Sequence, residues 1–106
     1  MSQPAVLTPE AREDLRDALF WIQQNNPQAA SDMRDAVRRA AQRIGEFPDI
    51  GVRRPDLAPD QFRFLVIPVF DYLVVYRAEG LPRARIMRIL YGKRHLETLL
   101  ASLTDH

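Results

Sequence analysis

Apolar residues recur every three or four positions in the first half of the chain and run together or alternate in the second half. From Pro9 onward, one apolar face has the spacing of an α-helix, and it contains Ala11, Leu15, Ala18, Leu19 and Ile22. Thr8 stands where a helix cap is expected, and a proline and an acid follow it, as is typical of a first turn. The pattern therefore predicts a helix that begins at Pro9.

A second helix is predicted directly after the first. Asn26 can cap it and Pro27 suits its first position, so a very short turn joins two antiparallel helices. This helix is expected to end near Gly45 or Phe47. Acids and arginines are interleaved on its polar face, which argues against nucleic-acid contact there. Its buried face is expected to contain Met33, Ala36, Val37, Ala40, Ile44 and Phe47.

Prolines and a glycine mark a connecting loop over residues 48–59, and strand-forming residues follow it. Strands are predicted over 62–67, 72–77 and 83–91, with turns at 68–71 and 79–82 whose lengths suit antiparallel hairpins. The middle strand is apolar on both faces, so we expect helices on one side of the sheet and another part of the chain on the other. Leucines at helical spacing after Gly92 predict a short closing helix: Leu96, Leu99, Leu100 and Leu103.

These elements predict an α+β fold. A short N-terminal strand, from the apolar stretch Ala5-Val6-Leu7, precedes a helical hairpin that packs on an antiparallel sheet in the order β-α-α-β-β-β, and a short C-terminal helix closes the chain. With 106 residues, we expect one domain over 1–106. The start of the chain lacks the pattern of a signal peptide, and no apolar run reaches the roughly 18 residues of a membrane span, which predicts a cytoplasmic protein without membrane association.

Composition excludes several kinds of chemistry. The chain has no cysteine and 2 histidines, so disulfides, thiolate zinc sites, cysteine nucleophiles and histidine-rich metal cages are excluded, and no metal or cofactor is expected. The few glycines are not clustered into a phosphate-binding loop, no common metal-binding motif occurs, and the sparse serines argue against a serine triad.

Charge is distributed unevenly. The formal net charge is +1, but the residues up to Ile50 carry an excess of acids and those from Gly51 onward an excess of bases. Residues 83–94 contain five basic side chains and no acid: Arg83, Arg85, Arg88, Lys93 and Arg94. Such a local field attracts phosphates or acidic protein surfaces, although a solvated strand edge has the same composition.

The basic terminus over 88–95, together with Arg63 on a neighbouring strand, is the one candidate for catalysis. Arginine can bind phosphate, and Tyr91 or His95 can transfer a proton, so this set could cleave RNA without a metal. The alternative is structural: Tyr91 packs, Gly92 turns the chain and His95 caps a helix or faces water.

Two aromatic residues interrupt the apolar pattern of the first helix. Phe20 is expected to point nearly opposite the apolar face, where it can contact a partner. Trp21 is expected at the edge of that face, where packing against the second helix is the simpler role and partner contact is the alternative.

Four segments in this order resemble the ParE branch of the ParE/RelE toxin superfamily. They are residues 7–15, the Phe47-Pro48-Asp49-Ile50-Gly51 corner, residues 72–77 and residues 88–96, and the match covers about Val6 to Leu100. The resemblance implies the fold described above. It also implies a toxin of a type II toxin–antitoxin system, held inactive by a small ParD-like antitoxin whose carboxy-terminal segment wraps the toxin.

The two branches of this superfamily differ in mechanism. RelE-like members are ribosome-dependent messenger-RNA endonucleases with five typical basic or tyrosine positions. Arg63 and Arg94 match two of them, whereas Leu65, Leu73 and Leu100 occupy the other three. Leucine can neither bind a phosphate nor transfer a proton, so the resemblance implies that the chain is not an enzyme and has no catalytic residues.

ParE-like members are regarded as non-catalytic inhibitors of DNA gyrase, so we expect a gyrase-binding toxin that forms a hetero-oligomer with its antitoxin and makes no direct nucleic-acid contact. The alternatives are a RelE-like endonuclease and a decayed toxin that only binds its antitoxin. The residues expected to contact the target are Arg63, Arg88, Lys93, Arg94 and His95. Those expected to contact the antitoxin are Phe20, Trp21, Arg83 and Arg85.

Overall fold

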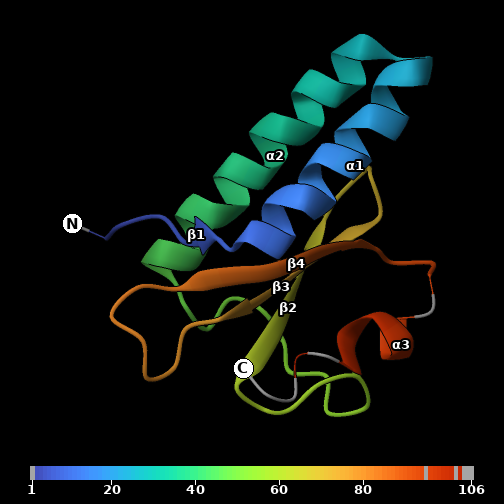
Figure 1. Ribbon diagram of the computed structural model, residues 1–106. Coiled ribbons are helices and arrows are strands. Elements are labelled where there is room, and N and C mark those ends of the chain that lie inside the picture. Colours follow the sequence, from blue (N-terminus) through green and yellow to red (C-terminus); the bar gives the residue numbers. More distant parts are fainter. Residues whose placement is uncertain (1, 95, 102, 104–106) are drawn as a thin grey trace.

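The computed structural model describes residues 2–94, 96–101 and 103, and it confirms the predicted order of elements (Figure 1). Strand β4 begins two residues later than the sequence predicts, at Arg85. The elements are β1 (Val6–Leu7), α1 (Pro9–Asn25), α2 (Pro27–Glu46), β2 (Phe62–Ile67), β3 (Tyr72–Arg77), β4 (Arg85–Tyr91) and α3 (Leu96–Leu100).

The two long helices begin where their capping residues predict. The Thr8 hydroxyl accepts a hydrogen bond from the Ala11 N–H at 3.2 Å, and the Asn26 side chain accepts one from the Ala29 N–H at 3.2 Å. Each cap satisfies a backbone donor of the first turn, which has no partner within its own helix. Asn26 both ends α1 and caps α2, so the helical hairpin turns within a single residue.

The four strands form one sheet in the order β1-β4-β3-β2. The meander β2-β3-β4 is antiparallel as predicted, and the short β1 pairs in parallel with β4, placing Val6 opposite Arg85. Because Thr8 follows β1 directly and its N–H donates to the Ile86 carbonyl, this pairing brings the start of α1 next to β4. On the opposite edge β2 is the last strand, bridged by the connecting loop at one position, where Val52 pairs with Phe64.

Two hydrophobic clusters cover the two faces of the sheet. The first lies between the helical hairpin and the sheet and includes Met33, Ile44 and Ile86. The second lies on the other face, where α3 and the loop around Ala58 cover Phe62 and Phe64. Figure 1 shows the hairpin on one side of the sheet and α3 on the other. The apolar character of both faces of β3 is therefore explained as the sequence predicts.

Two expectations about large side chains are wrong. Phe47 does not extend the buried face of α2: it is 61% exposed, because the helix ends at Glu46 and Phe47 is its C-terminal cap. Trp21 does not pack into the hairpin core and is 65% exposed, because its face of α1 is directed toward the end of the sheet. Within the described part of the chain, no helix is long and apolar enough to cross a lipid bilayer.

Candidate functional site

The residues predicted to contact the target lie in two separate places. Arg63, on β2, lines a cavity of about 510 Å³ beside the end of α2. Arg83, which is expected to contact the antitoxin instead, lines the same cavity. Arg88 and Arg94 line a different cavity of about 400 Å³, between α1 and the far end of the sheet, together with Trp21. The predicted basic surface is therefore not continuous.

Arg63 is held by the corner that follows α2. Its Nη1 donates a hydrogen bond to the Gly51 carbonyl at 2.9 Å, and its Nη2 lies 3.5 Å from an Asp49 carboxylate oxygen. Only 17% of the Arg63 side chain is exposed, whereas Asp49 is largely in solvent. The Arg63 guanidinium is therefore partly engaged by the chain itself, through Gly51 and Asp49.

Tyr76 fixes the same corner from beneath. Its buried hydroxyl donates to the Pro48 carbonyl at 2.6 Å and accepts from the Gly51 N–H at 2.9 Å. A Cβ at Gly51 would lie 2.7 Å from a Tyr76 ring carbon, so only glycine fits this approach. Burial raises the pKa of Tyr76, an effect that its hydrogen bond with Gly51 partly offsets. The Phe47–Gly51 motif therefore has a structural explanation.

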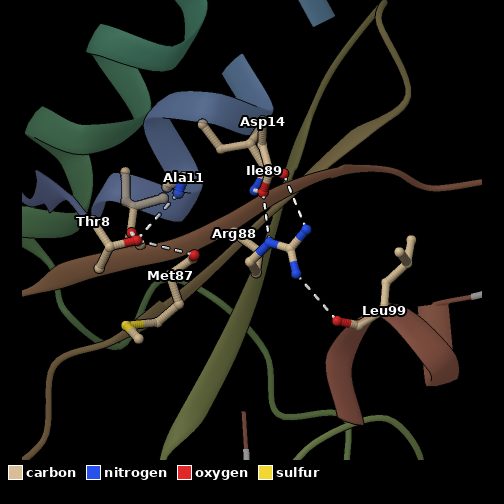
Figure 2. A network of polar contacts seen from close by, with 8 residues as sticks. Thr8, Ala11, Asp14, Met87, Arg88, Ile89 and Leu99 are labelled. Atoms are coloured by element: carbon tan, nitrogen blue, oxygen red, sulfur yellow. Dashed lines mark hydrogen bonds and ion pairs between the residues drawn. The ribbon is translucent and has the colours of Figure 1, made fainter. Parts of the chain in front are cut away.

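Arg88 joins three elements through a polar network (Figure 2). Its Nε and Nη2 donate to the two carboxylate oxygens of Asp14 on α1, at 2.7 and 3.0 Å, and its Nη1 donates to the Leu99 carbonyl of α3 at 3.2 Å. The Ile89 N–H donates to the same carboxylate at 3.0 Å. This Asp14 hydrogen bonding raises the pKa of Arg88. We call this network the Arg88 clamp; it comprises Asp14, Arg88, Ile89 and Leu99.

Asp14 belongs to this network, although the expected site residues do not include it. The signal was present, because Asp14 follows the buried Ala11 by three positions and precedes the buried Ala18 by four, so it lies on the inward side of α1. A carboxylate at such a position requires a partner, and only the fold shows that the partner is Arg88. The Thr8 hydroxyl makes a similar contact with the edge of β4, at 3.1 Å from the carbonyl oxygens of Ile86 and Met87.

The cavity between α1 and the sheet end has aromatic walls. Tyr72 and Tyr91 face each other across β3 and β4 with ring centroids 5.5 Å apart, and the exposed Trp21 also lines the cavity. Burial raises the pKa of Tyr72, and the nearby Arg94 charge opposes that shift. Asp17 is a further lining residue. Together with the Arg88 clamp, the lining holds two arginines and two aspartates, so its formal charges cancel.

The other predicted contact residues are mostly exposed. Lys93 and Arg94 follow β4 on the surface, and the Lys93 ammonium lies 3.8 Å from an Asp71 carboxylate oxygen. Phe20 is 60% exposed and meets Trp21 edge to face, with ring centroids 6.2 Å apart. Arg83 donates to the Pro4 carbonyl at 2.7 Å, and Arg85 is exposed at the start of β4; His95 lies outside the described residues.

The three leucines at the positions of typical endonuclease groups contribute to packing. Leu100 is 1% exposed in the cluster beneath the sheet, and Leu73 packs against the same cluster. Leu65 packs against the cluster beneath the helices. Among residues 2–94, 96–101 and 103 there is also no group of three side chains suited to hold a metal ion.

Comparison with known proteins gives a consistent result. A family model described as "ParE toxin of type II toxin-antitoxin system, parDE" matches residues 5–96. A solved structure described as the chromosomal ParDE TA system from P. aeruginosa has the same fold, with a TM-score of 0.70 and 19% sequence identity, over 85% of this chain and 96% of that chain. No curated protein matches the sequence significantly.

Proposed function

This chain belongs to the ParE toxin family of type II toxin–antitoxin systems, and from that membership we propose that it arrests growth by binding DNA gyrase without catalysis. We further propose that it acts in the cytoplasm and that a ParD-like antitoxin neutralises it. The family match over residues 5–96 supports the toxin assignment directly.

The main support for a non-catalytic mechanism is that two of the basic side chains form hydrogen bonds within the protein itself. The Arg88 guanidinium donates through three nitrogens to Asp14 and Leu99, and Arg63 donates to the Gly51 carbonyl, so both have partners within the fold. Leu100, at a position where an endonuclease has a tyrosine, is buried in a core. Cleavage of RNA requires groups that reach the reacting phosphate and transfer protons. A binding surface needs neither.

One observation favours the endonuclease alternative. Tyr91, Arg88 and Arg94 line a single cavity of about 400 Å³, which has room for a nucleotide. Two features oppose that function. Asp14 and Asp17 line the same cavity and repel phosphate, and Arg88 would have to leave the clamp to bind one. We therefore keep the endonuclease as the second candidate.

Lys93 and Arg94 are the exposed basic residues that we propose contact gyrase, with His95 as their neighbour in sequence. Phe20 and Trp21 are the residues that we propose anchor the antitoxin, because large exposed aromatic side chains are typical binding hot spots. Trp21 and Arg94 line the same cavity. An antitoxin bound on Trp21 would therefore cover Arg94, which provides a physical route to neutralisation.

The test uses purified protein in two parallel reactions, one with gyrase and supercoiled plasmid and one with ribosomes and messenger RNA. We expect gyrase-dependent DNA cleavage to accumulate and messages to stay intact. The double variant Lys93→Ala/Arg94→Ala should lose most of the gyrase effect, while Arg34→Ala, an exposed change on α2, should keep it. Cleaved messages with unaffected gyrase would establish the second candidate. No effect in either reaction, with antitoxin binding retained, would indicate a decayed toxin.

A further inference from the structure

The face of the molecule formed by α2 and the β2–β3 hairpin has a groove that the proposed gyrase and Trp21 contacts do not use. We propose that this groove binds an extended, acidic segment of the antitoxin. The inference rests on the proposed function, because it locates the proposed partner. We call this site the hairpin groove; its volume is about 490 Å³. It is lined by residues of α2 on one side and by residues 65–70 of the β2–β3 hairpin on the other.

The outer edge of the sheet has an open backbone position beside the groove. Val52 and Phe64 exchange two backbone hydrogen bonds, at 2.8 and 2.9 Å, on the outer side of β2. In an antiparallel ladder alternate residues direct their N–H and C=O groups to the same side, so Val66 also directs its groups outward. Among the described residues, the one backbone bridge on this outer side of β2 joins Val52 to Phe64. Pro68, the next of these alternate residues, has no N–H. The outer edge of β2 therefore offers one backbone position for pairing with another strand, at Val66.

An exposed valine beside the groove has a strained backbone conformation. Val69, at the tip of the hairpin, has a φ of 75° and is 91% exposed. A β-branched side chain is rarely found in the left-handed region, because its branches clash with the backbone there. The exposed side chain contributes little to the fold that could offset this strain. Strained residues of this kind occur mainly at functional sites, and Val69 lies at the rim of the groove beside Val66, which is 58% exposed.

Basic side chains of α2 form one wall of the groove. Arg39 and Arg43 are exposed and lie one helical turn apart on α2, above the apolar floor, while Asp32 is the one acid in the lining. The net charge is therefore positive and attracts carboxylates. Ala36 and Ala40 line the same wall and have short side chains that let another backbone approach closely. The groove thus fits an extended segment that pairs with Val66, places apolar side chains on Val69 and directs acidic side chains toward the arginines.

Val69→Asn is the most informative variant, because we expect it to raise the stability of the protein and to weaken antitoxin binding. Asparagine tolerates a positive φ, so relief of the strain should raise the midpoint of thermal unfolding, by about 4 °C. Loss of the apolar side chain should weaken antitoxin binding at least tenfold. A residue with a purely structural role would change stability and leave binding unchanged.

Charge reversal provides the second variant and its matched control. Arg39→Glu/Arg43→Glu should weaken antitoxin binding at least tenfold. Arg34→Glu introduces a charge reversal on the same helix outside the groove, and it should stay within twofold of the wild type. The comparison is made at 0.15 M salt, where charges more than about 8 Å apart are largely screened.

The experiment measures the dissociation constant of each toxin variant with the purified full-length antitoxin by calorimetry, together with amide hydrogen exchange at Val66. We expect the stated losses of affinity, and slower exchange of the Val66 N–H in the complex. Tight binding by all variants, with unchanged exchange at Val66, would overturn the groove assignment and leave the proposed function intact. Absence of binding by the wild-type toxin would overturn both. Concentration-dependent dimerisation that Val69→Asn abolishes would instead assign the groove to a second copy of this chain.

Discussion

The Arg88 clamp allows a quantitative test of how the C-terminal part of the toxin is held. In Asp14→Ala, the Arg88 guanidinium would keep only its contact with the Leu99 carbonyl, and the Ile89 N–H would lose its acceptor. The change leaves the rest of α1 in place, because alanine is a good helix former. The free energy of unfolding should therefore report the loss of the clamp alone.

The magnitude follows from the burial of the two charges. Removing one partner of a fully buried ion pair costs about 3–5 kcal/mol. The Arg88 and Asp14 side chains are 20% and 13% exposed, so water compensates part of that loss. We estimate about 2 kcal/mol for the broken pair and about 1 kcal/mol for the unpaired amide, which is about 3 kcal/mol in total. At about 4 °C or more per kcal/mol, the thermal midpoint should fall by at least about 12 °C.

The assay is urea and thermal unfolding followed by circular dichroism at pH 7. Asp14→Asn keeps one acceptor oxygen, so its loss should be intermediate, and Asp17→Ala, an exposed change on the same helix, should stay within about 0.5 kcal/mol of the wild type. In an Arg88→Met background, Asp14→Ala should cost much less, because the pair is already broken. Stability of Asp14→Ala within about 0.5 kcal/mol of the wild type would refute the clamp.

Three further predictions concern the corner after α2 and the exposed aromatic residues. Burial raises the folded-state pKa of Tyr76 above its ordinary value of 10.0, so the contribution of its neutral hydroxyl to stability is complete below about pH 10 and is lost as the pH rises through the folded-state pKa. Tyr76→Phe should therefore weaken the pH dependence of urea unfolding from pH 7 to 11 and lower the free energy of unfolding at pH 7 by about 1–3 kcal/mol. An unchanged pH profile in Tyr76→Phe would contradict this role of the hydroxyl. Gly51→Ala should lower the free energy of unfolding by about 1–3 kcal/mol, since its Cβ would lie 2.7 Å from Tyr76, and a fully stable variant would contradict the close approach. Trp21→Ala should change stability by less than about 0.5 kcal/mol but weaken antitoxin binding by about 30-fold in calorimetry; equal affinity would remove Trp21 from the proposed interface.

Local patterns were sufficient to predict most of the secondary structure. The caps Thr8 and Asn26 fix the helix starts through contacts within one turn, and β2 and β3 have the bounds that their strand-forming residues predict. The parallel pairing of β1 with β4 was not predictable in this way, because a strand of two residues has too little pattern to identify its neighbour.

The site was less predictable, because its contacts join residues far apart in the chain. Arg63 and Arg88 are of the residue type that binds phosphate, yet their main hydrogen-bond partners are Gly51 and Asp14, on other parts of the fold. A sequence shows that an arginine is present but not where its donors are directed. The exposure of Trp21 is unpredictable for the same reason, since the spacing of residues within a helix does not show which other element each side of the helix contacts.

The central claim is that this toxin acts by binding rather than by turnover, and a titration tests it most directly. Gyrase at a fixed concentration, well above the dissociation constant, is mixed with increasing purified toxin, and the supercoiling activity is measured. Binding predicts that activity falls in proportion to the toxin added and reaches its minimum near a fixed molar ratio. Full arrest at far less than one toxin per gyrase, or multiple messages cut per toxin in a ribosome reaction, would show turnover and contradict the account.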